Sequence, residues 1–168
     1  MKGIIIYKSK YGSTKQYAEW LKEETEFELY NITEFNNNLN NYDIIILAGS
    51  IHAGSFSLKG FLLDNWTIIS KKVTALMATS GASNNVVINN IIEKSLPSKV
   101  YNKIKIFPVG GQYLLKSMSF IDRNIIKIVA FFAKTPEIKK GMLTEKEDLH
   151  KKNLNEIKVF IVNAMNPH

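Results

Sequence analysis

The sequence contains no cysteine, and its three histidines are far apart along the chain. Without cysteine the chain forms no disulfide, carries no thiol nucleophile and ligates no iron–sulfur cluster through sulfur. The wide spacing of His52, His150 and His168 also argues against a histidine-rich metal site. We therefore expect no metal centre, although these observations leave a site of mixed ligands open.

The start of the chain lacks a long apolar run. Residues 3–7, GIIIY, hold four apolar side chains, which are too few for a signal peptide or a membrane span. We therefore expect a cytoplasmic protein. The chain also lacks internal repeats and Pro-rich or Gly/Ser-rich linkers, so its 168 residues predict a single domain, 1–168.

Acidic residues are the scarcer charged class, with 15 against 22 basic residues and a net charge of +7. Such a balance suits nucleic acid, an anionic membrane surface or an acidic partner. The sequence has no interleaved basic–aromatic motif, no zinc-finger pattern and no RNP motif. We therefore expect no nucleic-acid partner, which leaves an anionic lipid face or an acidic molecule.

Short apolar runs alternate with longer helical patterns. Strands are predicted at residues 3–7, 26–30, 43–48, 73–79 and 104–109, and helices at 14–24, 58–69, 85–95, 120–133 and 145–164. This alternation predicts an α/β protein with a five-stranded parallel sheet and helices on both faces. Ligands of such sheets bind outside the carboxyl ends of the strands, so the loops there are the candidate site.

The loop after the first predicted strand has the features of a phosphate-binding loop. Gly12 permits positive φ, and a helix follows at once, so its free N–H groups point into the loop. No acidic residue lies in the loop to repel an anion. An ordinary helix cap by Ser13 or Thr14 is the alternative. The candidate residues are Ser9, Lys10, Tyr11, Gly12, Ser13 and Thr14.

Two further loops would converge with this one at the same edge of the sheet. Small and polar residues after the third strand offer a backbone against which a flat ring could lie, and those after the fourth could hydrogen-bond the ring's polar edge. Plain β–α turns, with an unengaged histidine or a helix cap, are the alternatives. The candidate residues are Ser50, Ile51, His52, Ala53, Gly54, Thr79, Ser80 and Gly81.

The segment IIIYKSKYGST, residues 4–14, resembles the N-terminus of flavodoxins, in which the phosphate loop follows the first strand. The resemblance implies a flavodoxin-like three-layer sandwich with strand order 2-1-3-4-5, a helical insert after strand five, and FMN as cofactor. It implies a redox protein that transfers electrons through the flavin to a partner protein or a small molecule. The flavin carries the chemistry, and no catalytic acid or base is assigned.

A closer resemblance involves the loop GSIHAG at 49–54 and the stretch with Gly110, Gly111, Asp122 and Arg123. These segments are similar to the short, flavodoxin-like protoporphyrinogen dehydrogenases, which also carry a helical insert after strand five. That resemblance implies an FMN-dependent oxidoreductase with a porphyrinogen as electron donor and a quinone as acceptor. The basic charge suits this alternative, because a porphyrin carries carboxylates.

The predicted insert helix is unusually apolar. On a helical wheel its apolar face covers roughly two-thirds of the circumference, and the polar remainder is mainly a narrow basic stripe. We predict that the 119–134 helix forms a docking surface, through peripheral contact with the inner face of an anionic membrane or through a homodimer. Full burial under the C-terminal helix is the alternative. The basic stripe comprises Arg123, Lys127 and Lys134.

Overall fold

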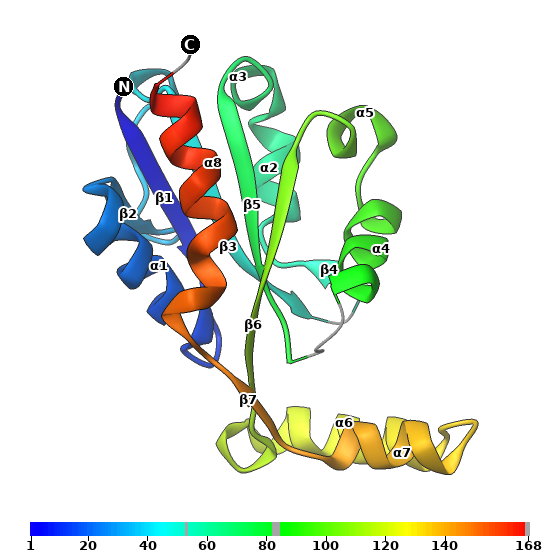
Figure 1. Cartoon of the computed structure of the whole chain (residues 1–168). Coiled ribbons are helices and arrows are strands. Elements are labelled where there is room, and N and C mark those ends of the chain that lie inside the picture. The colour runs from blue at the N-terminus through cyan, green and yellow to red at the C-terminus, as the bar shows by residue number, and fades with distance from the viewer. Residues whose placement is uncertain (53, 82–84, 167–168) are drawn as a thin grey trace.

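The computed structural model describes residues 1–52, 54–81 and 85–166 (Figure 1). The strands are β1 (Gly3–Lys8), β2 (Glu28–Asn31), β3 (Ile44–His52), β4 (Ser55–Phe56), β5 (Val73–Thr79), β6 (Lys105–Tyr113) and β7 (Lys146–Asp148). The α-helices are α1 (Ser13–Thr25), α2 (Lys59–Asp64), α3 (Trp66–Ile69), α4 (Asn85–Ser95), α5 (Ser98–Tyr101), α6 (Phe120–Phe131), α7 (Pro136–Leu143) and α8 (Asn155–Met165). Three 3₁₀ turns are also described, η1 (Leu39–Asn41), η2 (Leu115–Ser117) and η3 (Lys151–Leu154).

The sheet has the order β2-β1-β3-β5-β6-β7, with β4 paired to β3 off this path. The first five strands along this path run parallel, in the predicted order, which confirms the predicted α/β fold. Two short antiparallel strands are additional: β7 pairs with the end of β6, and β4 folds back on β3. Both additions lie where the sheet approaches the candidate site.

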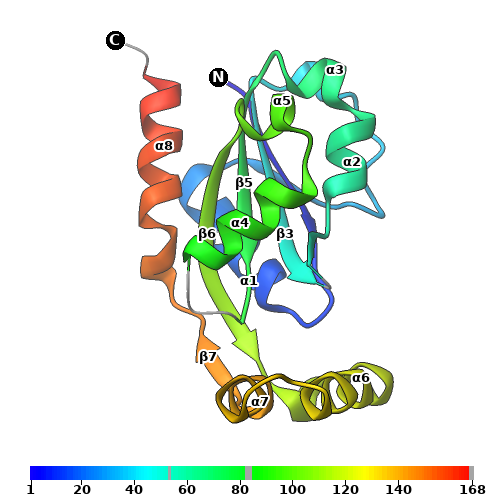
Figure 2. The ribbon, with the colours of Figure 1, turned by 90° about the vertical axis from the view of Figure 1, so that its right-hand side faces the viewer.

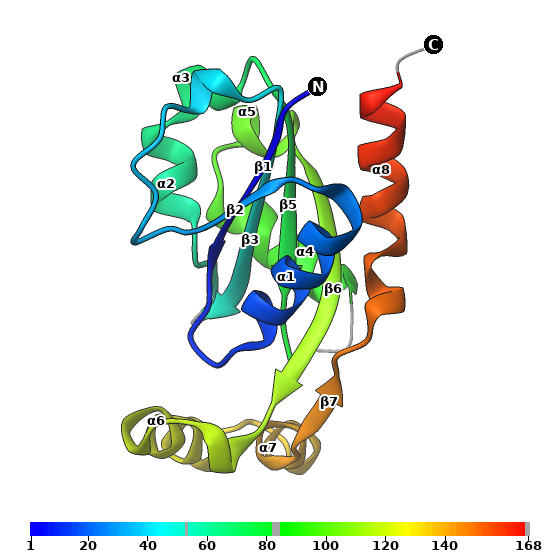
Figure 3. The ribbon, with the colours of Figure 1, turned by 90° about the vertical axis from the view of Figure 1, so that its left-hand side faces the viewer.

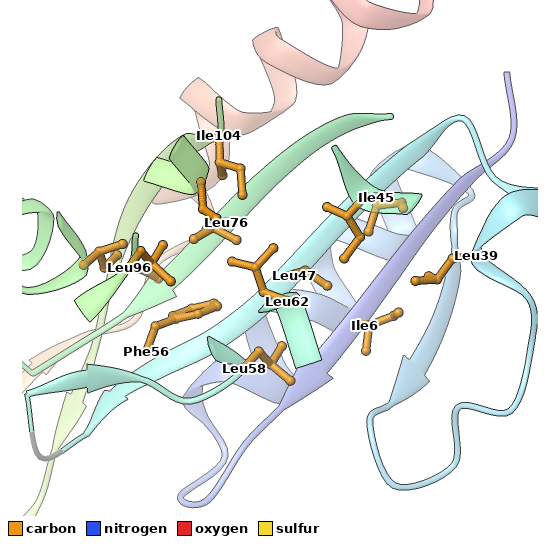
Figure 4. Packing of buried hydrophobic residues seen from close by; sticks show 14 of the residues in the cluster. Ile6, Leu39, Ile45, Leu47, Phe56, Leu58, Leu62, Leu76, Leu96 and Ile104 are labelled. Carbon is orange, nitrogen blue, oxygen red and sulfur yellow. The ribbon is translucent and has the colours of Figure 1, made fainter. Parts of the chain in front are cut away.

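Helices cover both faces of the sheet, as Figures 2 and 3 show from opposite sides. Successive side chains along β1 alternate between two cores, because a strand presents neighbouring residues to opposite faces. Ile4 and Ile6 pack with α2, α4 and α5, in the core shown in Figure 4, whereas Ile5 packs with α1 and α8. The apolar run at 44–48 of the predicted strand 43–48 is therefore buried on both faces of the sheet.

The chain leaves the sheet between β6 and β7 to form an insert. Helices α6 and α7 pack against each other and lie beyond the carboxyl ends of the parallel strands, in yellow and orange at the bottom of Figure 1. The predicted helix 120–133 is thus confirmed as α6. Its predicted alternative, burial under the C-terminal helix, is wrong, because α8 packs on the sheet while α6 keeps most of its apolar side chains exposed.

Two predicted helices differ from the observed ones. Residues 145–164 do not form one long helix, because residues 146–148 pair with β6 as strand β7 and α8 begins at Asn155. The predicted helix 58–69 is divided at Asn65 into α2 and α3. In addition, Pro136–Leu143 form helix α7, in a segment where no helix was predicted.

Candidate functional site

The order of the sheet places the candidate site beside β1 and β3. The chain leaves β1 towards β2 at one edge and leaves β3 towards β5 on the other side, so the strand order switches between them. At such a switch point the loops after the two strands diverge and leave room for a ligand. The carboxyl ends of both strands lie at the lower end of the sheet in Figure 1, on the side of the insert.

The loop after β1 has an uncapped helix end. Helix α1 begins at Ser13, and its N-cap Gly12 has φ 95° and ψ −32° with no side-chain cap. The predicted alternative, a cap by Ser13 or Thr14, is therefore not observed. The first N–H groups of an α-helix have no partner within the helix, and the first turn of α1 carries no acidic residue. This end of α1 can therefore bind an anion.

Gly12 is the residue that shapes this loop. Its backbone N–H donates to Ser9 Oγ at 3.1 Å, which folds the loop back on the end of β1. A Cβ placed on Gly12 would meet no other atom within 4 Å, so the space above this residue is open. The loop thus combines a backbone conformation that favours glycine with free room next to the helix end.

The hydroxyl groups at the start of α1 join it to neighbouring strands. Ser13 Oγ accepts a hydrogen bond from the backbone N–H of Gln112 at 3.2 Å. Thr14 Oγ1 lies 2.7 Å from Thr79 Oγ1, and Thr79 donates to the carbonyl of Gly49 at 3.3 Å. Thr14 and Thr79 are both buried, so these two predicted site residues link the three loops from beneath.

An aspartate of the insert also reaches the loop. The Asp122 carboxylate accepts hydrogen bonds from Lys10 Nζ and from the Tyr11 hydroxyl. These donors, Lys10 first, lower the pKa of Asp122 to about 2, and the pKa of Lys10 is raised in return. Two of the six predicted phosphate-loop residues therefore hold the insert. Sequence reasoning did not include Asp122 in the site, because its distance from Lys10 along the chain gives no indication of contact.

The segment after β3 is more ordered than a plain loop. Strand β3 continues to His52 and pairs with β4, with Ile51 opposite Phe56. The Ser50 N–H donates to Ser57 Oγ at 3.0 Å, and a Cβ on Gly49 would lie 2.7 Å from the Phe56 ring, so Gly49 permits this close packing. His52 is exposed at the tip. Gly54 has φ 74° with open space around it, and Ala53 lies outside the described residues.

The segment after β5 approaches the end of β6. The Ser80 N–H donates to the Gly110 carbonyl at 2.9 Å. A Cβ on Gly81 would lie 2.4 Å from Tyr113 Cβ, so the absence of a side chain at Gly81 lets Tyr113 pack against it. The rest of this predicted loop, residues 82–84, lies outside the described residues.

A family model described as a flavodoxin domain matches residues 4–139. The chain belongs to the flavodoxin domain family. A comparison with curated proteins found no match.

Three solved structures are similar to this member of the flavodoxin domain family. A flavodoxin, WrbA-like protein from Agrobacterium tumefaciens is 22% identical with a TM-score of 0.48, over 73% of this chain and 87% of that one. A flavoprotein in complex with FMN from Lactobacillus acidophilus is 19% identical with a TM-score of 0.49, over 65% and 91%. A flavodoxin from the domain Archaea is 15% identical with a TM-score of 0.42, over 94% and 99%.

The residues of the first loop fit the cofactor of this family. Flavodoxins hold FMN at the switch point of the sheet. Here that point carries an uncapped helix end, open space above Gly12 and no acidic residue in the first turn of α1, and the Asp122 carboxylate beside it is paired with Lys10. A terminal phosphate would find backbone N–H donors there. Family membership and this loop together support the prediction of FMN.

Proposed function

We propose that this flavodoxin-family chain binds FMN with its phosphate at the Ser9–Thr14 loop and exchanges electrons with a redox partner through the exposed edge of the flavin. The cofactor, when bound, supplies one- and two-electron redox chemistry. The chain's own contribution is to hold the phosphate, to present the ring at the carboxyl ends of β3 and β5, and to set the charge around it.

The observation that carries this proposal is the N-terminus of α1. The helix starts directly after β1, its N-cap is a glycine with positive φ, and no side chain caps its first turn. The free N–H groups and the positive end of the helix dipole favour a phosphate group. The remaining predicted contacts, from Ser50–Gly54 and Thr79–Gly81, are proposed to border the ring.

The test compares ligands that differ in the phosphate. Purified apoprotein is titrated with FMN and with riboflavin, which lacks the phosphate, and binding is followed by quenching of flavin fluorescence. We expect FMN to bind at least about a hundredfold more tightly, because several charge-assisted hydrogen bonds are lost with riboflavin. Equal affinities for the two ligands would show that the loop does not bind phosphate.

FAD serves as the second comparison ligand. Its phosphate continues into a pyrophosphate and an adenosine, and the sequence has no dinucleotide-binding fingerprint. We therefore expect weaker binding of FAD than of FMN. Tighter binding of FAD would contradict the assignment of a mononucleotide site and would leave the redox role to be reassigned.

A second candidate function is a flavin-dependent dehydrogenase of the protoporphyrinogen and quinone type. It is favoured by the position of the insert, whose helices α6 and α7 lie at the same end of the sheet as the proposed cofactor site (Figure 1). An insert at this edge can enclose a small-molecule substrate, which an electron carrier that meets proteins does not require. The excess of basic residues also suits a substrate with carboxylates.

Anaerobic mixing separates the two candidates. The FMN-loaded protein is offered a porphyrinogen, and bleaching of the flavin absorbance is recorded; the reduced protein is then offered a quinone. Reduction by the porphyrinogen and reoxidation by the quinone, each faster than with free FMN, would establish the dehydrogenase. If the porphyrinogen does not reduce the flavin while FMN stays tightly bound, the dehydrogenase function is excluded and the electron-carrier function is supported.

A further inference from the structure

Helix α6 presents an apolar face to solvent. Five apolar side chains of α6 and that of its C-cap residue, Phe132, are at least half exposed. They are Phe120 (77%), Ile121 (70%), Ile125 (52%), Ile128 (59%), Phe131 (74%) and Phe132 (76%). We call these six residues the apolar face of α6. Within the helix, Ala130 is the residue that is buried. The ordinary arrangement of a surface helix, apolar towards the protein and polar towards water, is thus reversed.

Polar contacts fix the opposite side of α6 to the protein. Asp122 is held by Lys10 and Tyr11 of the loop after β1. Arg123 donates through Nη2 to the carbonyls of Lys116 and Met118, at 3.2 and 3.1 Å. Because these polar residues face inward, the apolar face is directed away from the sheet. The pair α6–α7 lies at the end of the molecule, where a flat surface could approach it (Figures 1 and 2).

The insert also carries much of the positive charge of the chain. Residues 114–144 contain six basic and two acidic residues, a net charge of +4 within a total of +7. One of the two acidic residues, Asp122, is turned inward and paired with Lys10. Four lysines of the insert are exposed: Lys127 on α6, Lys134 just after it, and Lys139 and Lys140 on α7.

We infer that the apolar face of α6 and these exposed lysines bind the surface of an anionic lipid bilayer, with α6 lying in the plane of the interface. Apolar side chains that enter the acyl boundary, together with cations near anionic headgroups, are the two terms that hold such helices on membranes. In the part of the chain that the structure describes, no helix has the length and apolar character needed to span a bilayer. The contact is therefore peripheral.

Charge favours a lipid surface over a second copy of the chain. Two copies joined face to face would bring together two inserts of net charge +4, and such repulsion opposes association. An anionic bilayer neutralises the same charges. The proposal does not depend on the proposed redox function, since vesicle binding is measured without any electron transfer.

Vesicle co-sedimentation of the full chain tests the proposal. Vesicles of phosphatidylcholine with 30% phosphatidylserine are compared with pure phosphatidylcholine, at low and at high salt. We expect binding to the anionic vesicles, weaker binding to the zwitterionic ones, and a decrease with salt, because salt screens the lysine contribution. Absence of binding to anionic vesicles would overturn the proposal.

Matched variants assign any binding to this surface. Phe131→Ser/Phe132→Ser removes two side chains that are about three-quarters exposed, and we expect roughly a hundredfold weaker binding from the lost apolar area. Lys127→Gln/Lys134→Gln should weaken binding to anionic vesicles by roughly 25-fold, about fivefold per lysine.

The control uses another helix with an exposed apolar pair. Val159 and Val162 on α8 are 60% and 56% exposed, and Val159→Ser/Val162→Ser should leave vesicle binding unchanged. If this control variant loses binding as strongly as the α6 variants, the surface has been misplaced. If the protein is instead dimeric by sedimentation and the α6 phenylalanine variant is monomeric, the face is a subunit interface and the lipid proposal fails.

Discussion

Replacement of Gly12 by alanine tests the phosphate loop with a single methyl group. Gly12 has φ 95° and ψ −32°, a conformation that L-residues rarely adopt, and its Cβ would meet no protein atom within 4 Å. The substitution therefore adds backbone strain without a steric clash inside the protein. Strain of this kind costs about 1–3 kcal/mol.

That cost must be visible in the FMN-saturated protein, however the apoprotein responds. If the loop keeps its conformation in the apoprotein, the strain lowers the free energy of unfolding by about 1–3 kcal/mol and leaves FMN affinity nearly unchanged. If the loop relaxes in the apoprotein, stability is retained and FMN affinity falls by roughly 5- to 150-fold. In both cases the loss in unfolding free energy of the apoprotein and the loss in FMN binding free energy add up to at least the strain energy, because the FMN-bound protein requires the native loop.

The assay is urea denaturation of apoprotein and FMN-saturated protein, together with fluorescence titration of FMN. Gly60→Ala is the control, because Gly60 lies inside α2, has no left-handed φ and has open space around it. Alanine should stabilise this helix slightly, by up to about 1 kcal/mol. The reasoning is refuted if Gly12→Ala leaves both apoprotein stability and FMN affinity at the wild-type values.

Four other predictions concern charge and anchoring. Asp122→Asn should raise FMN affinity a few-fold at low salt, because it removes a negative charge from the phosphate loop and frees Lys10; unchanged affinity in a fluorescence titration would contradict this. The lowered pKa of Asp122, about 2 against an ordinary 3.8, means that the stabilising pair with Lys10 is fully present above about pH 4 and is lost as the pH falls towards 2. Acid unfolding of wild type and Asp122→Asn should therefore converge in that window. Tyr17→Phe should lower stability by about 1–3 kcal/mol in urea, because the Tyr17 hydroxyl donates to the Asp148 carbonyl and accepts from Asn153 Nδ2, both at 2.9 Å; a loss below about 0.5 kcal/mol would show that water replaces it. The midpoint potential of bound FMN should lie above that of acidic flavodoxins, because negative charge around the flavin disfavours its anionic reduced form and this chain has an excess of basic residues. One unit charge at ~10 Å changes the energy of that anion by roughly 0.4–1.7 kcal/mol, and potentiometric titration gives the comparison.

The sheet could be predicted because its strands carry their own pattern. The predicted strands at 3–7, 43–48 and 73–79 each contain a run that is apolar on both faces, at 4–6, 44–48 and 75–78, and that pattern arises when helices cover a parallel strand from both sides. The conformation of the loop after β1 was predictable for a similar reason. A glycine between a strand and a helix permits positive φ, and Gly12 has φ 95°.

Strand β7 could not be predicted from its own residues. Its sequence, Lys146–Asp148, is fully charged and gives neither an apolar nor an alternating pattern. It becomes a strand because β6 continues to Tyr113 and offers an edge to which these residues pair. The predicted C-terminal helix began too early, at residue 145, for the same reason. Its helical pattern does not show that residues 146–148 pair with β6 before α8 begins at Asn155.

The contact between Asp122 and the phosphate loop illustrates the limit on site prediction. The helical wheel of the 119–134 segment gave a polar stripe of Arg123, Lys127 and Lys134, but a wheel does not indicate which element of the protein faces each side of the helix. The sheet decides this, because β6 and β7 carry the insert past the ends of the strands and set α6 next to Lys10 and Tyr11.

This geometry connects the apolar face of α6 to the cofactor loop through one carboxylate. Asp122 and a bound phosphate are both anions, and the Lys10 ammonium can satisfy either. A phosphate that competes for Lys10 weakens the link between α6 and the loop after β1. Cofactor binding and the position of the insert are then coupled, and the coupling is reciprocal.

The Asp122→Asn variant tests this coupling, because it removes the negative charge that competes with the phosphate for Lys10. The cap of α6 stays in place, since Ser119 Oγ accepts from the backbone N–H of residue 122, at 3.1 Å. In wild type, anionic vesicles should therefore change FMN affinity, and in Asp122→Asn this change should be smaller. An equal effect of vesicles on both proteins would show that the insert and the cofactor loop act independently.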